Sequence, residues 1–173
     1  MNECEDLRKL TLTDGVVVPA RIIRPDDAPA LQRLHSRLSE ESIRLRFFGS
    51  MKELSAWKAK YFAHVDGVNS FALVALNPTE HDEIIAIVRF DCEEGTDKAE
   101  YTALVEDRWQ GSGLGLAMTR HLIDGARDRG IRSFYALVKP ENRSMLKLLR
   151  SLDLPEREGR DEGVKCVEVE LVA

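Results

Sequence analysis

Val105-Glu106-Asp107-Arg108-Trp109-Gln110-Gly111-Ser112-Gly113-Leu114-Gly115 is the stretch that decides the fold of this chain. It joins a predicted strand, 98–105, to a predicted helix that begins near Leu114, with glycine at alternate positions between them. The start of a helix presents unpaired backbone N–H groups and the positive end of the helix dipole, so this turn favours an anion such as pyrophosphate. Glycine also lets the backbone approach such an anion closely.

Two nucleotide-binding alternatives use similar turns. A dinucleotide-binding turn needs the spacing G-x-G-x-x-G and an acidic residue about twenty positions later, at the end of a next strand. Asp128 falls near that distance but inside the predicted helix. A P-loop needs Gly-Lys followed by Ser or Thr, which this turn lacks. Both alternatives fit poorly, although the turn alone does not identify its ligand.

The segments around the turn predict a mixed α+β domain. Three short strands are expected at 70–76, 84–91 and 98–105. Their short connecting loops favour an antiparallel meander. The helix from Leu114 is expected to end at Gly130, where glycine can take the left-handed conformation that terminates helices. A strand follows at 133–138, and because a helix joins it to the strand at 98–105, the two should lie parallel with a right-handed crossover.

The rest of the chain completes one domain, 1–173. The acidic segment 1–14 is expected to be a flexible leader. The remaining predicted elements are a strand at 16–23, a helix capped by Asp26 or Asp27 and running to Leu38, a short helix from Ser39 towards Phe48, a helix at 55–64, a helix at 142–152 and a strand at 164–171. The helix at 142–152 should bury Met145, Leu148, Leu149 and Leu152.

Composition narrows the class of function. The formal net charge is −5 and no concentrated basic segment is present, which argues against nucleic-acid binding. The cysteines Cys4, Cys92 and Cys166 are far apart, so neither a disulfide framework nor a zinc site is expected, and reduced cytosol is the natural compartment. The start does not resemble a signal peptide, and no apolar run approaches the ~20 residues of a membrane span.

The histidines also give no sign of a metal site. His35, His64, His81 and His121 lack metal-ligand spacing. His121 lies on the apolar stripe of the helix after the glycine turn, where a core position is expected. Arg44, Arg46 and the pair Phe47-Phe48 are candidates either for the wall of a substrate cleft or for plain core.

The glycine turn resembles the acyl-CoA motif of the GNAT N-acetyltransferase superfamily, Gln/Arg-x-x-Gly-x-Gly/Ala. Other segments are similar to the catalytic domain of bacterial Pat-type protein lysine acetyltransferases, over roughly 16–154. They are Arg24-Pro25-Asp26-Asp27, Leu45-Arg46-Phe47-Phe48, and Asn142-Arg143-Ser144-Met145 with Leu148-Leu149. The resemblance implies a GNAT fold with acetyl-CoA as cosubstrate and no metal.

The resemblance also assigns site residues. Backbone groups of Leu104 and Val105 would pair with the pantetheine arm, and Asn142 would hydrogen-bond that arm from the other side. The pyrophosphate would be bound by the amides of Gln110, Gly111, Ser112, Gly113, Leu114 and Gly115. Glu100 matches the glutamate that acts as general base in Pat-type enzymes; the alternative is that it is merely a solvated acidic residue.

The sequence departs from the family pattern at two site positions. Ser112 stands where the turn often carries Lys or Arg, so backbone and dipole, or Arg108 or Arg120, would have to compensate. Leu149 stands where many members have a tyrosine that protonates the leaving thiolate. Tyr101 and Tyr135 are the candidate substitutes for this acid, and the sequence favours neither.

The predicted function is transfer of an acetyl or short acyl group from CoA to a primary amine, with a protein lysine as first choice. The alternatives are a small-molecule amine as acceptor, and a non-catalytic acyl-CoA sensor. The sequence does not fix the oligomeric state, and a homodimer is one option.

Overall fold

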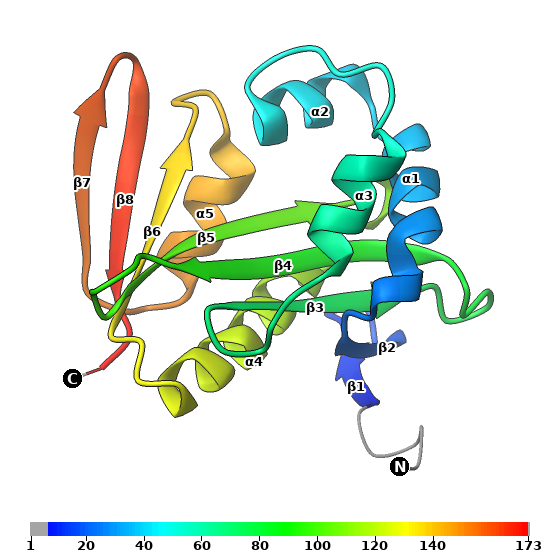
Figure 1. The fold of residues 1–173 in the computed structure, drawn as a ribbon, viewed down its shortest axis with the longest axis horizontal. Helices are drawn as coiled ribbons and strands as arrows, with labels where there is room; N and C mark the ends of the chain where they lie inside the picture. Colours follow the sequence, from blue (N-terminus) through cyan, green and yellow to red (C-terminus); the bar gives the residue numbers. More distant parts are fainter. Residues whose placement is uncertain (1–6, 173) are drawn as a thin grey trace.

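The computed structural model describes residues 7–172, and its centre is a sheet of eight strands in the order β1-β2-β3-β4-β5-β6-β8-β7 (Figure 1). The strands are β1 (Arg8–Thr11), β2 (Val17–Ile22), β3 (Ser70–Leu76), β4 (Ile84–Cys92), β5 (Lys98–Val105), β6 (Ser133–Val138), β7 (Glu156–Asp161) and β8 (Val164–Glu170). Neighbouring strands run antiparallel except β5 and β6, which are parallel. The predicted α+β class, the meander and the parallel crossover are confirmed.

Helices cover both faces of this sheet. They are α1 (Ala28–Ser36), α2 (Glu40–Phe47), α3 (Ala56–Ala63), α4 (Leu114–Asp128) and α5 (Arg143–Ser151), with short 3-10 turns at Pro25–Asp27 and Asp107–Trp109. Strand β3 shows how the two layers form, because its side chains alternate between faces. Phe71 and Leu73 join the core under α4, whereas Ala72 and Val74 join the core under α1 and α3.

Helix α2 differs from the other helices because it hardly enters either core. Ile43 is its buried residue. In Figure 1 the helix lies beyond the sheet, opposite the loop between β6 and α5. Arg44 reaches that loop with an ion pair of 2.8 Å to Glu141. The α2 segment therefore spans the open end of the sheet between β5 and β6.

Part of the expected leader is a strand. Within 1–14, β1 pairs antiparallel with β2 and buries Leu10 against the core under α4, and Leu12 directly after the strand is buried in the same core. The prediction of flexibility is therefore wrong for Arg8–Thr11, where Leu10, in alternation with Leu12 just after the strand, points into the core. Residues 1–6 of the expected leader lie outside the described residues.

Strand β7 was not predicted at all. Its six residues are almost entirely exposed, so they lack the apolar alternation that identifies a strand. The hairpin to β8 holds it in place through Glu162 and Gly163, both with positive φ, at 48° and 78°. Two such residues are typical of the tight turns that join antiparallel strands.

The buried face of α5 also differs from the prediction. Leu146 and Leu149 are buried, and Leu152 directly after the helix is buried as well. Met145 and Leu148, which were expected in the core, are only partly buried. The reason is that this side of α5 faces a cleft in the sheet and not a second packed layer.

Candidate active site

Strands β5 and β6 form a parallel pair over only a short distance. Lys98, Ala99 and Glu100 pair with Ser133, Phe134 and Tyr135, and the two strands separate beyond that point. On its other side, β5 stays paired with β4 along its length, from Ala99 opposite Cys92 to Val105 opposite Ala86. The sheet therefore opens between the carboxyl-terminal halves of β5 and β6.

The register of β5 shows which backbone groups face this opening. Glu106 donates its N–H to the Ile85 carbonyl at 2.9 Å. Because the backbone groups of successive residues in a strand point to opposite neighbours, the N–H and C=O of Leu104, two residues earlier, also point towards β4. The N–H and C=O groups of Ala103 and Val105 then point towards β6. This differs from the sequence-based expectation, because Leu104 is engaged with β4 and Ala103 takes its place at the opening.

A cleft of about 500 Å³ occupies the opening. Its lining includes every site residue predicted from the sequence except Ser112. These predicted lining residues are Glu100, Leu104, Val105, Gln110, Gly111, Gly113, Leu114, Gly115 and Asn142. Charged side chains in the lining are Glu100, Arg46 and Lys147.

The glycines of the turn serve different structural purposes. Gly111 and Gly113 have φ values of 74° and 87°, a left-handed conformation that disfavours other residues. A Cβ on Gly113 would also lie 3.1 Å from Cγ2 of Thr13. A Cβ on Gly115 would lie 3.0 Å from Cδ1 of Leu148, so this glycine allows α4 to pack closely against α5.

The turn leaves a row of backbone donors without partners. Within residues 7–172, the amides from Gly111 to Leu116 donate no hydrogen bond, and Gly113, the N-cap of α4, offers no side-chain cap. Unpaired amides at a helix N-terminus are well suited to bind an anion. Leu116 thus joins the set predicted from sequence.

Gln110 and Ser112 differ from the other residues of the turn. The Gln110 amide donates to the Asp107 carbonyl at 3.1 Å, and its side-chain Nε2 donates to the Val105 carbonyl at 2.9 Å. The Ser112 hydroxyl donates to the Trp109 carbonyl, and the Ser112 carbonyl accepts from Thr13. The side chains of Gln110 and Ser112 therefore hold the shape of the turn.

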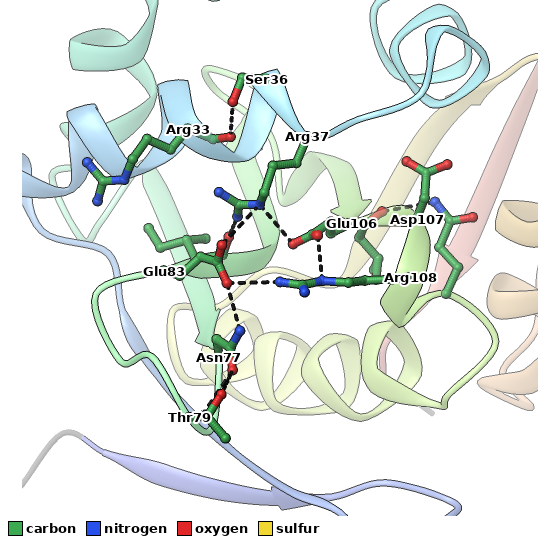
Figure 2. Close-up of polar contacts among 12 residues, drawn as sticks. Arg33, Ser36, Arg37, Asn77, Thr79, Glu83, Glu106, Asp107 and Arg108 are labelled. Atoms are coloured by element: carbon green, nitrogen blue, oxygen red, sulfur yellow. Dashed lines mark hydrogen bonds and ion pairs between the residues drawn. The ribbon is translucent and has the colours of Figure 1, made fainter.

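A partly buried charge cluster fixes the end of β5 in front of the turn. Figure 2 shows Arg37 and Arg108 between the carboxylates of Glu83 and Glu106. Glu106 is 3% exposed and lies 2.7 Å from Arg108 and 3.2 Å from Arg37. Asn77 donates to Glu83 at 2.7 Å, and this hydrogen bond, helped by the two arginines, lowers the pKa of the Glu83 carboxyl.

This cluster excludes one expected anion ligand. Arg108 is engaged by Glu83 and Glu106 and is absent from the cleft lining. Arg120 is also absent from the lining and donates to the Ser151 carbonyl at 3.3 Å. Lys147 on α5, which the sequence reasoning missed, is the cation that lines this part of the cleft. Helical spacing could have revealed this residue, because Lys147 lies on the same face of the helix as Ser144, Leu148 and Ser151.

Glu100 lies where β5 and β6 begin to separate. It is half-buried, and within the described chain it forms no hydrogen bond or ion pair. Burial raises the pKa of the Tyr135 hydroxyl opposite, and the Glu100 charge raises it further. Burial lowers the pKa of Arg46 to about 10, while Glu100 acts against this shift. The Glu100 side chain thus lines the cleft with no hydrogen-bond donor from residues 7–172 on its carboxyl group.

Asn142 both caps helix α5 and lines the cleft. As the N-cap of α5, its Oδ1 accepts from the Met145 amide at 3.1 Å. Its Nδ2 has no partner among residues 7–172, and the residue lines the cleft. One side-chain atom therefore stabilises the helix while the other remains available to a ligand.

Neither Leu149 nor Tyr101 supplies an acid to the cleft. Leu149 is 2% exposed and packs in the core. The Tyr101 hydroxyl bonds to Thr119 at 2.6 Å in the core under α4, and burial raises the pKa of that hydroxyl well above its usual value. Tyr135 is absent from the cleft lining.

Helix α2 forms one wall of the cleft, and the two residues of the pair Phe47-Phe48 have different roles there. Phe47 packs against the core under α1 and α3, whereas Phe48 lines the cleft and is 43% exposed. Arg46 and Leu45 line the cleft as well. Phe48 ends α2 with a left-handed φ of 61°, which turns its ring towards the opening.

Other expectations concern metals, thiols and membranes. No cluster of three potential metal ligands occurs within residues 7–172, and Cys92 and Cys166 are free there. Cys4 lies outside the described residues. His121 is half-buried and lies 3.1 Å from an Arg8 nitrogen, so its predicted core position is wrong. Among the described helices, none has the length and apolar character needed to cross a membrane.

Comparisons with known proteins agree with this geometry. Residues 32–153 match the model of the acetyltransferase (GNAT) family. The chain is 32% identical to acetyltransferase PA5475 of Pseudomonas aeruginosa, covering 91% of this chain and 85% of that protein.

Solved structures show the same relationship. The GNAT domain of S. lividans PAT is 32% identical with a TM-score of 0.88, over 98% of this chain and 99% of that one. A cAMP-binding acyltransferase from Mycobacterium smegmatis is 25% identical with a TM-score of 0.67, over 96% of this chain but only 48% of that one. The sheet that opens between β5 and β6, together with the glycine turn, therefore corresponds to an acyltransferase fold. The chain belongs to the GNAT acetyltransferase family, and this membership implies acetyl-CoA as acyl donor.

Proposed function

We propose that this enzyme transfers an acetyl or short acyl group from acetyl-CoA to a primary amine, with a protein lysine as the acceptor. The observation that carries the proposal is the separation of β5 and β6 beyond Glu100, directly beside the unpaired amides from Gly111 to Leu116. The similarity to the PAT domain supports a protein acceptor.

The donor end of the cleft comprises the amides from Gly111 to Leu116, the open backbone of Ala103 and Val105, Asn142 and Lys147. The amides and the α4 dipole would hold the pyrophosphate. The Ala103 and Val105 backbone, together with Nδ2 of Asn142, would orient the pantetheine arm from both sides. Lys147 would meet the 3′-phosphate, since it is the cation that lines this end. The residues present therefore fit the donor that the family implies.

The acceptor end comprises Glu100, Arg46, Leu45 and Phe48. Acetyl-CoA supplies an acyl group activated as a thioester, and the acceptor amine must be neutral to attack it. A lysine with a pKa of about 10.4 is neutral in only around one molecule in a few thousand at pH 7, which costs roughly 4 to 5 kcal/mol. Glu100 would accept the amine proton directly or through a water, and thereby offset this cost.

The carbonyl oxygen gains negative charge as the amine attacks. The N–H of Val105 points into the opening and is available as a donor for that oxygen, while the hydrogen bond from Gln110 to the Val105 carbonyl restrains the end of the strand. The new C–N bond forms as the C–S bond breaks, and the sulfur leaves as a thiolate. Because thiols have a pKa of about 8.5, the thiolate can leave without an acid at the position of Leu149.

A second function is a sensor that binds acyl-CoA without turnover. It is supported by the burial of Leu149 and by the hydrogen bond that holds the Tyr101 hydroxyl at Thr119, away from the role of an acid. The decisive experiment is release of CoA thiol from acetyl-CoA with folded proteins, polyamines, aminoglycosides and amino acids as acceptors, followed by mass spectrometry of modified lysines. Turnover that depends on a protein acceptor supports the proposal. Turnover only with small amines would replace the acceptor, and binding without turnover on any amine would support the sensor.

A further inference from the structure

A second, smaller cavity of about 40 Å³ lies beside the acceptor end of the cleft. Side chains of β4 and β5 line one side of it, and side chains of α1, α2 and α3 line the other. The small cavity shares Arg46, Thr102 and Leu104 with the main cleft, so the two spaces adjoin. Since one buried water needs about 10–15 Å³, the small cavity has room for about three groups of that size.

His35 is buried in the wall of the small cavity without a hydrogen-bond partner for one of its ring nitrogens. The residue is 4% exposed, and its Nε2 has no partner among residues 7–172. Its ring packs against Phe47, with 5.9 Å between the ring centroids. Burial lowers the pKa of His35, so the imidazole is neutral near pH 7 and can carry its hydrogen on Nε2. A buried nitrogen of this kind is destabilising unless a water or a ligand pairs with it.

Two further polar groups of the small cavity also lack partners. The Arg46 guanidinium forms no hydrogen bond or ion pair with residues 7–172, and the Thr102 hydroxyl forms no hydrogen bond with them. The guanidinium lies 4.9 Å from the centroid of the Phe47 ring, the same ring that contacts His35. Three unpaired polar side chains therefore surround one space.

The charges around the small cavity favour an anion. Arg46 and Arg89 line it, and none of the described residues in its lining is acidic. Arg89 is already engaged, because it donates to the Asp91 carboxylate at 2.8 and 2.9 Å and to the Phe62 carbonyl at 2.9 Å. Glu100 lines the main cleft but not the small cavity. The Arg46 charge is thus unbalanced within the cavity, and a guanidinium pairs well with a carboxylate.

We propose that the small cavity binds the carboxylate group of a substrate, with the Arg46 guanidinium, Nε2 of His35 and the Thr102 hydroxyl as donors. This inference rests on the proposed function, because the ligand is part of a substrate held in the adjoining cleft. A carboxylate has three heavy atoms, which matches the space, and its two oxygens can accept three hydrogen bonds. The carboxylate belongs either to a dicarboxylic acyl group on CoA or to the acceptor.

The test compares ligands that differ at the carboxylate, by titration calorimetry on the whole chain. In the donor pair, succinyl-CoA has a carboxylate where butyryl-CoA has a methyl group. In the acceptor pair, measured with CoA present, lysine has a carboxylate where lysinamide has an amide. The wild type should bind the carboxylate member of a pair about tenfold more tightly.

The two pairs distinguish the two sources of the carboxylate. Preference within the donor pair identifies the acyl group, and preference within the acceptor pair identifies the acceptor. If neither pair shows a preference, the cavity holds water only and the proposal is overturned.

Substitutions connect the preference to the small cavity. Arg46→Met should abolish it, and Thr102→Val, which keeps the side-chain shape, should reduce it about threefold. Arg33→Met removes an exposed arginine of α1 and should leave the preference as in the wild type. Each value is a ratio within one variant, so a general loss of binding cancels. A wild-type ratio in Arg46→Met would contradict the proposal.

The proposed function is tested separately by thiol release from acetyl-CoA. An acetyl group has no carboxylate, so this activity does not depend on a ligand in the small cavity. Turnover of acetyl-CoA without any preference for carboxylates would retain the proposed function and overturn this inference alone.

Discussion

The donor end and the acceptor end of the cleft are built from different parts of the chain. The donor end consists mainly of backbone groups in one continuous stretch, Gly111 to Leu116, next to the open edge of β5. The acceptor end consists of side chains brought together from α2 and β5, such as Arg46 and Glu100, which are separated by 54 positions in the sequence. A site made of backbone donors is retained after side-chain substitutions as long as the backbone conformation is kept. A site made of charged side chains is lost when those residues are substituted.

Gly113→Val should have the largest effect because it attacks the conformation on which the donor end depends. A branched side chain is strained at φ 87° and would meet Thr13 Cγ2, only 3.1 Å from the position of the new Cβ. We expect CoA binding to weaken by about 100-fold or more, measured by titration calorimetry. Gly159→Val is the control, since Gly159 lacks a positive φ and has open space around it. Wild-type affinity in Gly113→Val would contradict the assignment of the turn.

Glu100→Gln addresses the acceptor end and should affect rate alone. Removing the general base is expected to lower kcat by about 100-fold, while the affinity for acetyl-CoA stays the same. Stopped assays of thiol release, together with calorimetry, measure the two quantities. Glu93→Gln, an exposed change in the turn between β4 and β5, should be neutral. Full activity in Glu100→Gln would remove this residue from the proposed mechanism.

Asn142 allows the helix cap and the ligand contact to be separated. Asn142→Ser keeps an oxygen that can cap α5 but loses the Nδ2 donor, whereas Asn142→Ala loses both. Both variants should bind acetyl-CoA about tenfold more weakly. Only Asn142→Ala should lose about 1 kcal/mol in the free energy of unfolding, measured by urea denaturation. If binding is unchanged in both, Asn142 acts only as a cap.

Lys147→Met should have the smallest effect, since the side chain is exposed. We expect about fivefold weaker binding of CoA and unchanged binding of dephospho-CoA, because only CoA carries the 3′-phosphate. Arg150→Met, on the same helix but outside the cleft lining, is the matched control. Equal weakening for both ligands would place the contact elsewhere.

The same contrast explains which features could be predicted from sequence. The turn and the strands β3, β5 and β6 are encoded locally by glycine spacing and β-branched or apolar runs, so their positions were predicted to the residue. Strand β7 has no buried face and depends on its pairing with β8, which no local pattern reveals.

The site follows the same rule. The engagement of Leu104 with β4 and the open position of Ala103 depend on strand register, and the fixed conformations of Gln110 and Arg108 depend on partners such as Asp107 and Glu83. Arg46 and Glu100 line the same cleft only because α2 crosses the open end of the sheet. Such relations exist only after folding and could not be predicted from residue types.

The gap beside β5 also gives the molecule an internal sheet edge. Exposed strand edges are prone to pair with other chains, and most proteins protect them. Here the arm of the donor would lie along that edge and complete the sheet. Amide hydrogen exchange at Ala103 and Val105 should therefore slow when CoA is added, so ligand occupancy would be recorded in the stability of the sheet itself.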